Sequence, residues 1–92
     1  MKDTITKEKI ENYYKVTSHA LTIAKKSVAK NKKKEAEEIF LIVECYLKDA
    51  VYFKEKKDFV NAFGCLNYAH GWLDCGARLK IFIVKDTRLF TV

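Results

Sequence analysis

Apolar side chains recur every three or four residues along three long segments of this chain. At about 100° per residue, that spacing gathers the apolar positions of each segment on one stripe of a helix. The first stripe is Ile10, Tyr13, Thr17, Ala20, Leu21, Ala24 and Val28. The second is Ala36, Ile39, Phe40, Val43, Leu47 and Ala50, and the third is Phe59, Ala62, Phe63, Leu66, Ala69, Leu73 and Ala77. The pattern predicts helices over about residues 5–30, 34–56 and 58–83.

Short polar residues mark the expected ends of these helices. A hydroxyl of Thr4 or Thr6 can accept a hydrogen bond from the free backbone N–H groups of the first helix, and Asp58 can do so for the third. Asn31 tolerates the left-handed backbone conformation that commonly ends a helix. The connections are therefore only a few residues long, which makes the three helices antiparallel neighbours.

These features predict a single all-α domain over residues 1–92, an up-down-up antiparallel three-helix bundle with a short C-terminal tail docked on it. The tail is expected to comprise residues 84–92. The second helix carries a further apolar row on its back, away from the main stripe: Leu41, Cys45 and Tyr52. We expect the apolar tail to cover this row, with a second copy of the chain as the alternative occupant.

The composition supports this fold class and limits the chemistry. The chain has no proline and three glycines, too few turn-forming residues for a loop-rich β architecture. No apolar run approaches the ~20 residues that a membrane span needs, so we expect no membrane partner. Cys45, Cys65 and Cys75 form no CxxC pair and fall within apolar helical patterns, which is typical of reduced core thiols in a cytoplasmic protein.

The third predicted helix carries the most distinctive surface. Its polar row is narrow, because five residues widen the apolar arc: Cys65, Tyr68, Trp72, Cys75 and Leu79. The row, with Trp72 beside it, is our candidate interaction or ligand site: Gly64, Asn67, His70, Gly71, Trp72, Asp74 and Arg78. A glycine inside a helix costs about 1 kcal/mol relative to alanine, so Gly64 and Gly71 indicate the close approach of another backbone or a ligand. The alternatives are a solvated polar face and glycines that serve helix packing within the chain.

The sequence contains no recognisable catalytic, metal or cofactor motif. General acid–base catalysis needs groups that converge in a pocket, and a row along one helix offers little concavity. Cys65, His70 and Cys75 fall on different sides of the helix, which does not suit zinc, and there is no glycine-rich phosphate loop. We therefore expect no enzyme activity, metal or cofactor. A small-ligand site at His70, Asp74 and Arg78 is a third hypothesis for function.

A basic cluster follows the first predicted helix. The chain has 18 basic and 12 acidic side chains, and its net charge of +6 favours acidic partners. Six lysines lie within ten residues, with no acidic residue among them: Lys25, Lys26, Lys30, Lys32, Lys33 and Lys34. They are the candidate nucleic-acid contacts, although no aromatic residue lies among them to stack on bases. The alternative is a solvated turn in which three of these lysines complement the negative end of the first helix.

The third helix and the C-terminus resemble a known family. The segment NYAHGWLDCGARLKIF, residues 67–82, and the ending RLFTV, residues 88–92, are similar to an archaeal family of short helical proteins, domain of unknown function 357. The resemblance rests on a consecutive run and three further positions: Tyr68, Ala69, His70, Gly71, Trp72, Leu73 and Asp74, then Gly76, Arg78 and Leu79. Cys75 and Lys80 depart from the family pattern. The resemblance implies an up-and-down three-helix bundle in an archaeal cytoplasm, without an established activity, cofactor or catalytic residue.

Together these observations favour a non-enzymatic interaction or assembly module. Either the polar row of the third helix or the apolar back of the second would meet a protein partner or a second copy of the chain. The second hypothesis is a weak nucleic-acid-binding protein that uses the basic cluster at residues 25–34.

Overall fold

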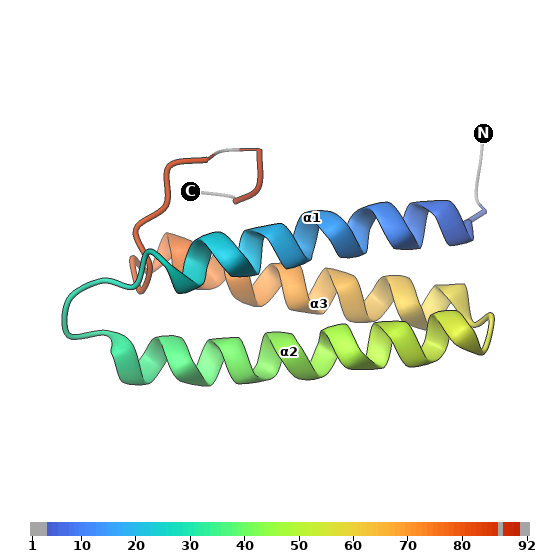
Figure 1. Cartoon of the computed structure of the whole chain (residues 1–92), viewed down its shortest axis with the longest axis horizontal. Coiled ribbons are helices and arrows are strands. Elements are labelled where there is room, and N and C mark those ends of the chain that lie inside the picture. The colour runs from blue at the N-terminus through green and yellow to red at the C-terminus, as the bar shows by residue number, and fades with distance from the viewer. Residues whose placement is uncertain (1–3, 87, 91–92) are drawn as a thin grey trace.

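The structure, a computed structural model that describes residues 4–86 and 88–90, contains three helices: α1 (Lys7–Lys25), α2 (Lys33–Glu55) and α3 (Phe59–Arg78). They run alternately up and down and lie side by side in a rod of 42 × 25 × 16 Å (Figure 1). The chain after α3 turns back over the end of α1 (Figure 1). The all-α, antiparallel three-helix bundle predicted from the sequence is therefore confirmed.

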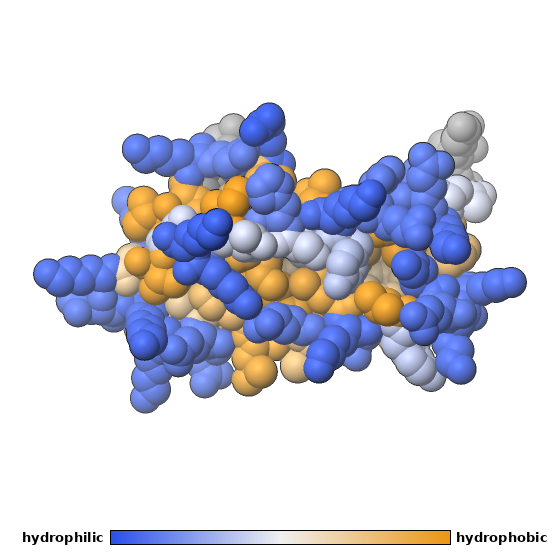
Figure 2. All heavy atoms as spheres, in the orientation of Figure 1, coloured by the Kyte–Doolittle hydropathy of each residue, from blue (hydrophilic) through white to orange (hydrophobic). Residues whose placement is uncertain are grey.

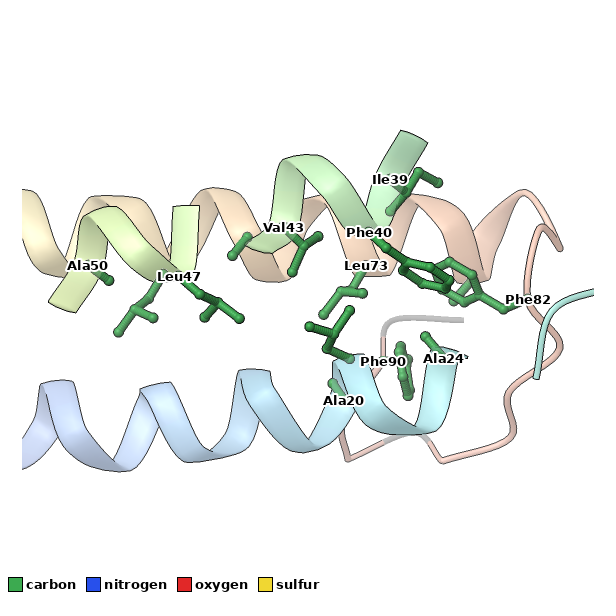
Figure 3. Close-up of a cluster of buried hydrophobic side chains, with 14 of the residues drawn as sticks. Ala20, Ala24, Ile39, Phe40, Val43, Leu47, Ala50, Leu73, Phe82 and Phe90 are labelled. Atoms are coloured by element: carbon green, nitrogen blue, oxygen red, sulfur yellow. The ribbon is translucent and has the colours of Figure 1, made fainter. Parts of the chain in front are cut away.

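The predicted apolar stripes form the core between the helices. Side chains of α2 such as Val43 and Leu47 point toward α1, and the small side chains of Ala20 and Ala24 lie on the facing side of α1 (Figure 3). Apolar atoms also reach the surface along the middle of the molecule, between flanks of hydrophilic side chains (Figure 2). The buried stripe residues are Ile10, Thr17, Ala20, Leu21, Ala24, Ala36, Ile39, Phe40, Val43, Leu47, Ala50, Ala62, Leu66, Ala69, Leu73 and Ala77.

The starts of α1 and α3 have the predicted caps. The Thr6 hydroxyl accepts a hydrogen bond from the Lys9 backbone N–H at 3.1 Å, and the Asp58 carboxylate accepts one from the Asn61 N–H at 3.2 Å. Each cap satisfies one of the backbone donors that a helix start leaves without an intrahelical partner. α2 differs, because Lys32 precedes its first turn and makes no side-chain cap.

The first helix ends at Lys25, about five residues before the predicted end. The Ser27 hydroxyl donates to the Ile23 carbonyl at 2.8 Å, and the Ser27 N–H donates to the Ala24 carbonyl at 3.0 Å, which closes the last turn. Asn31 has the predicted left-handed conformation, with φ of 68°, but it lies in the linker before α2 instead of ending α1.

The linker leaves the helical path because it pairs with the chain beyond α3. Val28 and Phe82 form an isolated antiparallel β-bridge. On either side of it, the Ala29 N–H donates to the Ile81 carbonyl at 2.9 Å, and the Ile83 N–H donates to the Ser27 carbonyl at 2.8 Å. These long-range hydrogen bonds outweigh the helical preference of the local sequence.

The third helix ends at Arg78, about five residues before the predicted end. Lys80 adopts the left-handed conformation with φ of 60°. The Ile81 N–H then donates to the Gly76 carbonyl at 2.9 Å and the Lys80 N–H to the Ala77 carbonyl at 3.1 Å, which is a Schellman motif. This turn reverses the chain and brings the Phe82 ring onto Gly76.

The tail docks on the bundle, as predicted, but not at the predicted place. Phe82 is fully buried and stacks on Phe40, with ring centroids 5.7 Å apart, and Phe90 packs beside them near Ala24 (Figure 3). Leu41, by contrast, remains 61% exposed. Because the Schellman turn and the β-bridge direct the tail toward α1, the expectation that it covers the back of α2 was wrong. The predicted tail positions 87, 91 and 92 lie outside the described residues.

A second Schellman motif ends α2 and provides a test of this local geometry. Lys57 has φ of 61°, and the Asp58 N–H donates to the Phe53 carbonyl at 2.8 Å. A side chain in this conformation is strained, so Lys57→Gly should raise the free energy of unfolding by about 1 kcal/mol. Urea denaturation measures the change. Lys56→Gly is the matched control, because φ of −81° at Lys56 needs no glycine; an equal gain there would contradict the prediction.

Candidate functional site

The predicted polar row of α3 divides into two parts with different surroundings. The part formed by Asn67 and His70 faces α1. The Tyr13 hydroxyl donates to the Asn67 side-chain oxygen at 3.0 Å, and the Thr17 hydroxyl lies 3.2 Å from His70 Nδ1. These contacts form a polar seam between α1 and α3, so both side chains join two helices of the same chain.

His70 is held in place by this seam. Its side chain is 15% exposed, and its ring lies 5.8 Å from that of Tyr13, centroid to centroid. His70 Nε2 lies 3.8 Å from Asp74 Oδ1, which is beyond hydrogen-bond distance. Thr17 is completely buried, and the imidazole is the partner of its hydroxyl. Burial, together with the Asp74 carboxylate, raises the pKa of the Tyr13 phenol. This geometry is that of an imidazole positioned by packing and hydrogen bonding.

The other part of the row contains two open glycines. A Cβ atom placed on Gly64 or on Gly71 would meet no atom within 4 Å. These glycines therefore do not serve helix packing within the chain, and that alternative is wrong. Gly76 does serve it, because a Cβ there would collide with the Phe82 ring. Sequence reasoning missed this role of Gly76, which depends on a turn that the periodicity of α3 did not reveal.

Exposed apolar side chains lie beside the open glycines. Tyr68 and Leu79 are each 64% exposed, and Trp72 is 39% exposed. We call these three residues, the exposed Cys75 and the two glycines the outer face of α3: Gly64, Tyr68, Gly71, Trp72, Cys75 and Leu79. Two shallow depressions meet at Gly71 and Cys75, one reaching Tyr68 and Trp72 and the other Asp74 and Arg78. Each includes four residues at the spacing i, i+3, i+4 and i+7, the arrangement that receives a side chain of a facing helix.

The small-ligand hypothesis finds no walled site at His70, Asp74 and Arg78. The depression beside Asp74 and Arg78 is lined by residues 71–79 alone, without a wall from α1 or α2. His70 points instead into the seam with α1. Within residues 4–86 and 88–90, no three side chains of the types that bind metal ions come together. A pocket that excludes water, which catalysis generally requires, is not formed by this row.

The apolar back of α2 is also open to solvent. Leu41 and Tyr52 are 61% and 57% exposed, and Cys45 is exposed. At the boundary of the two helices, Tyr46 of α2 stacks on Tyr68 of α3 with ring centroids 5.4 Å apart. The exposed Tyr68 of α3 is therefore in contact with α2 at this stacked pair.

The cysteines have a different environment from the one predicted. All three are free thiols, but Cys45 and Cys75 are exposed and Cys65 is half-buried, so the expectation of core thiols was wrong. Each lies on the flank of its apolar stripe, where a helical wheel cannot tell whether a neighbouring helix covers the position. Burial, with the Asp49 carboxylate nearby, raises the pKa of the Cys65 thiol.

The six candidate nucleic-acid lysines gather at one end of the bundle and are exposed. Lys25 lies 3.4 Å from Glu44, and Lys32 lies 3.7 Å from Glu35. Lys33 and Lys34 begin α2. The solvated-turn alternative assumed that Lys30 lies at the negative end of α1. Because α1 already ends at Lys25, Lys30 does not lie there.

Comparison with known proteins places this bundle in a family. No helix in the described part of the chain combines the length and the apolar character required to cross a bilayer. No curated protein and no solved structure matches the chain. Residues 12–82 match the family described as "Protein of unknown function (DUF357)". The matched region includes most of α1, all of α2 and α3, and the turn that returns Phe82 to the core. The chain therefore belongs to the DUF357 family.

Proposed function

We propose that the protein is a non-enzymatic assembly module whose outer face of α3 packs against a second copy of the chain. The observation that carries the proposal is that α3 is exposed on one side yet nearly uncharged. Two of its 20 residues, Asp74 and Arg78, carry a formal charge, against ten of 23 in α2. Solvated helix faces are usually charged, whereas the cores of protein interfaces are depleted in charge and enriched in Trp and Tyr.

The exposed aromatic side chains suit the centre of such an interface. Trp72 and Tyr68 project beside Gly71, whose missing side chain lets a facing helix approach closely. Trp and Tyr are enriched among the residues that contribute most to binding. A buried partner surface would also offset the helix-propensity cost of about 1 kcal/mol at each open glycine.

The spacing of residues along α3 favours a second copy as the partner. Gly64, Gly71 and Arg78 follow one another at seven-residue steps and so lie on nearly the same line along the helix. If two α3 helices cross antiparallel at Gly71, Arg78 lies opposite Gly64 of the second copy, where no side chain obstructs the guanidinium. Twofold symmetry repeats this pairing, which makes the surface self-complementary.

Sedimentation equilibrium and the fluorescence of Trp72, the only tryptophan, test this proposal. We expect a monomer–dimer equilibrium and a blue shift of the emission as the protein concentration rises. Gly71→Leu should weaken dimerisation at least about thirtyfold, the effect of losing a major interface contact, without loss of helical circular dichroism. His19→Leu adds the same side chain at an exposed position of α1 and should leave dimerisation unchanged.

Two results would overturn the proposal. One is a wild-type chain that stays monomeric up to millimolar concentration. The other is a Gly71→Leu variant that dimerises as well as the wild type, since a side chain at the crossing point would then be harmless.

We further infer a cytoplasmic location. The three free cysteines support it, because exposed thiols persist where the compartment is reducing.

A further inference from the structure

The net charge of the chain is concentrated at one end of the bundle. Residues 25–38 and 78–90 contain ten basic and four acidic side chains, so their net charge is +6, the same as that of the whole chain. The remaining residues contain eight side chains of each sign and are neutral. Such an asymmetric distribution orients the molecule toward anionic partners and raises their rate of encounter.

The fold brings these two distant segments together. The β-bridge between Val28 and Phe82 sets residues 27–29 beside residues 81–83. Both segments lie at the end of the rod where α1 leads into α2 (Figure 1). Lys80 and Lys85, which flank the second segment, therefore join Lys26 and Lys30, which flank the first. The sequence cluster at residues 25–34 is therefore only part of this surface, which we call the basic end.

Two lysines of the basic end lie where they do not stabilise the fold. Lys25 ends α1 and complements the negative end of its dipole. Lys33 and Lys34, however, lie in the first turn of α2, at the positive end of a helix, where a cation is unfavourable. Lysines in such positions break a local rule of helix stability, and departures of this kind tend to mark functional surfaces.

Several cations of the basic end are available to a ligand. Ion pairs engage three of its side chains, with Glu44 near Lys25, Glu35 near Lys32 and Asp86 near Arg88. The other six lysines are exposed and make no ion pair with another described residue: Lys26, Lys30, Lys33, Lys34, Lys80 and Lys85. Six exposed cations at one end of the bundle suit a partner that carries several negative charges.

The burial of the aromatic residues at this end favours one class of polyanion over the others. Phe40, Phe82 and Phe90 are all buried in the core, so they cannot stack on unpaired bases or insert into a lipid surface. Lysine contacts phosphate as a point charge, whereas base edges are read by planar, bidentate groups such as arginine. We propose that the basic end binds the phosphodiester backbone of duplex nucleic acid through lysines of both segments, without reading the bases. This interaction uses a different surface from the outer face of α3 and goes beyond the assembly function.

Fluorescence anisotropy with a labelled 20-base-pair DNA duplex tests this proposal on the full chain. Binding through about six phosphates should weaken about a thousandfold between 50 and 200 mM salt. The triple variant Lys26→Ala, Lys30→Ala and Lys85→Ala removes cations of both segments. It should reduce the slope of log affinity against log salt by about three. Two duplexes of unrelated sequence should bind with affinities within a factor of about three of each other.

The control variant has the same net charge as the test variant, but the three lysines that it loses lie outside the basic end. The triple variant Lys7→Ala, Lys15→Ala and Lys48→Ala changes exposed positions outside the basic end and should keep the wild-type salt slope. Equal loss in both triple variants would overturn the proposal. So would salt-independent binding, a tenfold preference between duplexes, or binding to vesicles of anionic phospholipid but not to the duplex. Unchanged circular dichroism of both variants excludes unfolding as the cause of lost binding.

Discussion

Replacing Phe82 with alanine is expected to lower the free energy of unfolding by about 3–5 kcal/mol. The ring is completely buried although it lies beyond the last helix. It stacks on Phe40 of α2, contacts Phe90 of the tail, and fills the space above Gly76 of α3. Removing it opens a cavity at the point where two helices and the tail meet, so the loss includes the cavity as well as the transferred surface.

Urea denaturation followed by circular dichroism measures this effect. The total stability of a domain of this size is usually about 5–15 kcal/mol, so Phe82→Ala can approach complete unfolding. Phe82→Leu preserves most of the volume and should cost only about 1.5 kcal/mol, which keeps the comparison measurable. Ile83→Ala is the control, since its side chain is 53% exposed and should change stability by less than about 1 kcal/mol. A Phe82→Ala variant as stable as the control would show that the tail is not part of the core.

The periodicity of the sequence was sufficient to predict the bundle. Spacing of apolar residues is a local property that survives in the fold, because each helix buries the stripe that its own sequence defines. Ala20, Val43 and Leu66 were all assigned to the core in this way, and all are fully buried. The caps at Thr6 and Asp58 are equally local, since each side chain bonds a backbone group three residues ahead.

The ends of α1 and α3 could not be predicted in the same way. Both ends depend on the pairing of Val28 with Phe82, residues that are 54 positions apart in the sequence. The apolar pattern of each segment continues for several residues beyond the observed end of the helix. The helix ends earlier because the chain forms tertiary hydrogen bonds there instead. Lys80 adopts the left-handed conformation, although glycine or asparagine is the usual residue at such a position.

The candidate site residues of α3 were predicted to form one row, but the structure divides them between two surroundings. A helical wheel placed Asn67, His70 and Gly71 in one row, yet it cannot show which neighbour lies on each side. In the structure, Asn67 and His70 contact Tyr13 and Thr17 of α1. Gly71 instead faces outward. Likewise, the basic side chains of the tail lie near the lysine cluster only because the folded chain brings the two segments together. Local spacing thus identifies chemically unusual residues, and packing determines which of them share a surface.

Replacing Gly76 with alanine should lower the free energy of unfolding by about 2 kcal/mol, although alanine is the better helix former. The added Cβ would collide with Cζ and Cε1 of the Phe82 ring and lie 3.1 Å from the Ile39 Cδ1 atom. The ring cannot retreat easily, because Phe40 and Phe90 lie against it. The variant must therefore displace the tail or strain the core, and overpacking of this kind usually costs more than helix propensity returns.

Alanine substitutions of the other two glycines of α3 serve as controls, because they should change the free energy of unfolding in the opposite direction. Gly71→Ala and Gly64→Ala place a methyl group in open space and should each raise the stability of the monomer by up to about 1 kcal/mol. The test is urea denaturation at protein concentrations where no dimer forms, so that any interface at Gly71 does not contribute. If Gly76→Ala also stabilises the chain, the close packing of Phe82 on Gly76 is not a constraint on the fold.

A double-mutant cycle identifies the colliding group. Leucine at position 82 lacks the ring atoms nearest to the added Cβ, so Gly76→Ala should be much less destabilising in a Phe82→Leu background. We expect a coupling free energy of at least about 1 kcal/mol between the two positions, because they are in direct contact. Additive effects would instead mean that Gly76→Ala acts through Ile39 or through the helix itself. The cycle thus tests whether one missing side chain in α3 is what allows the tail to close the bundle.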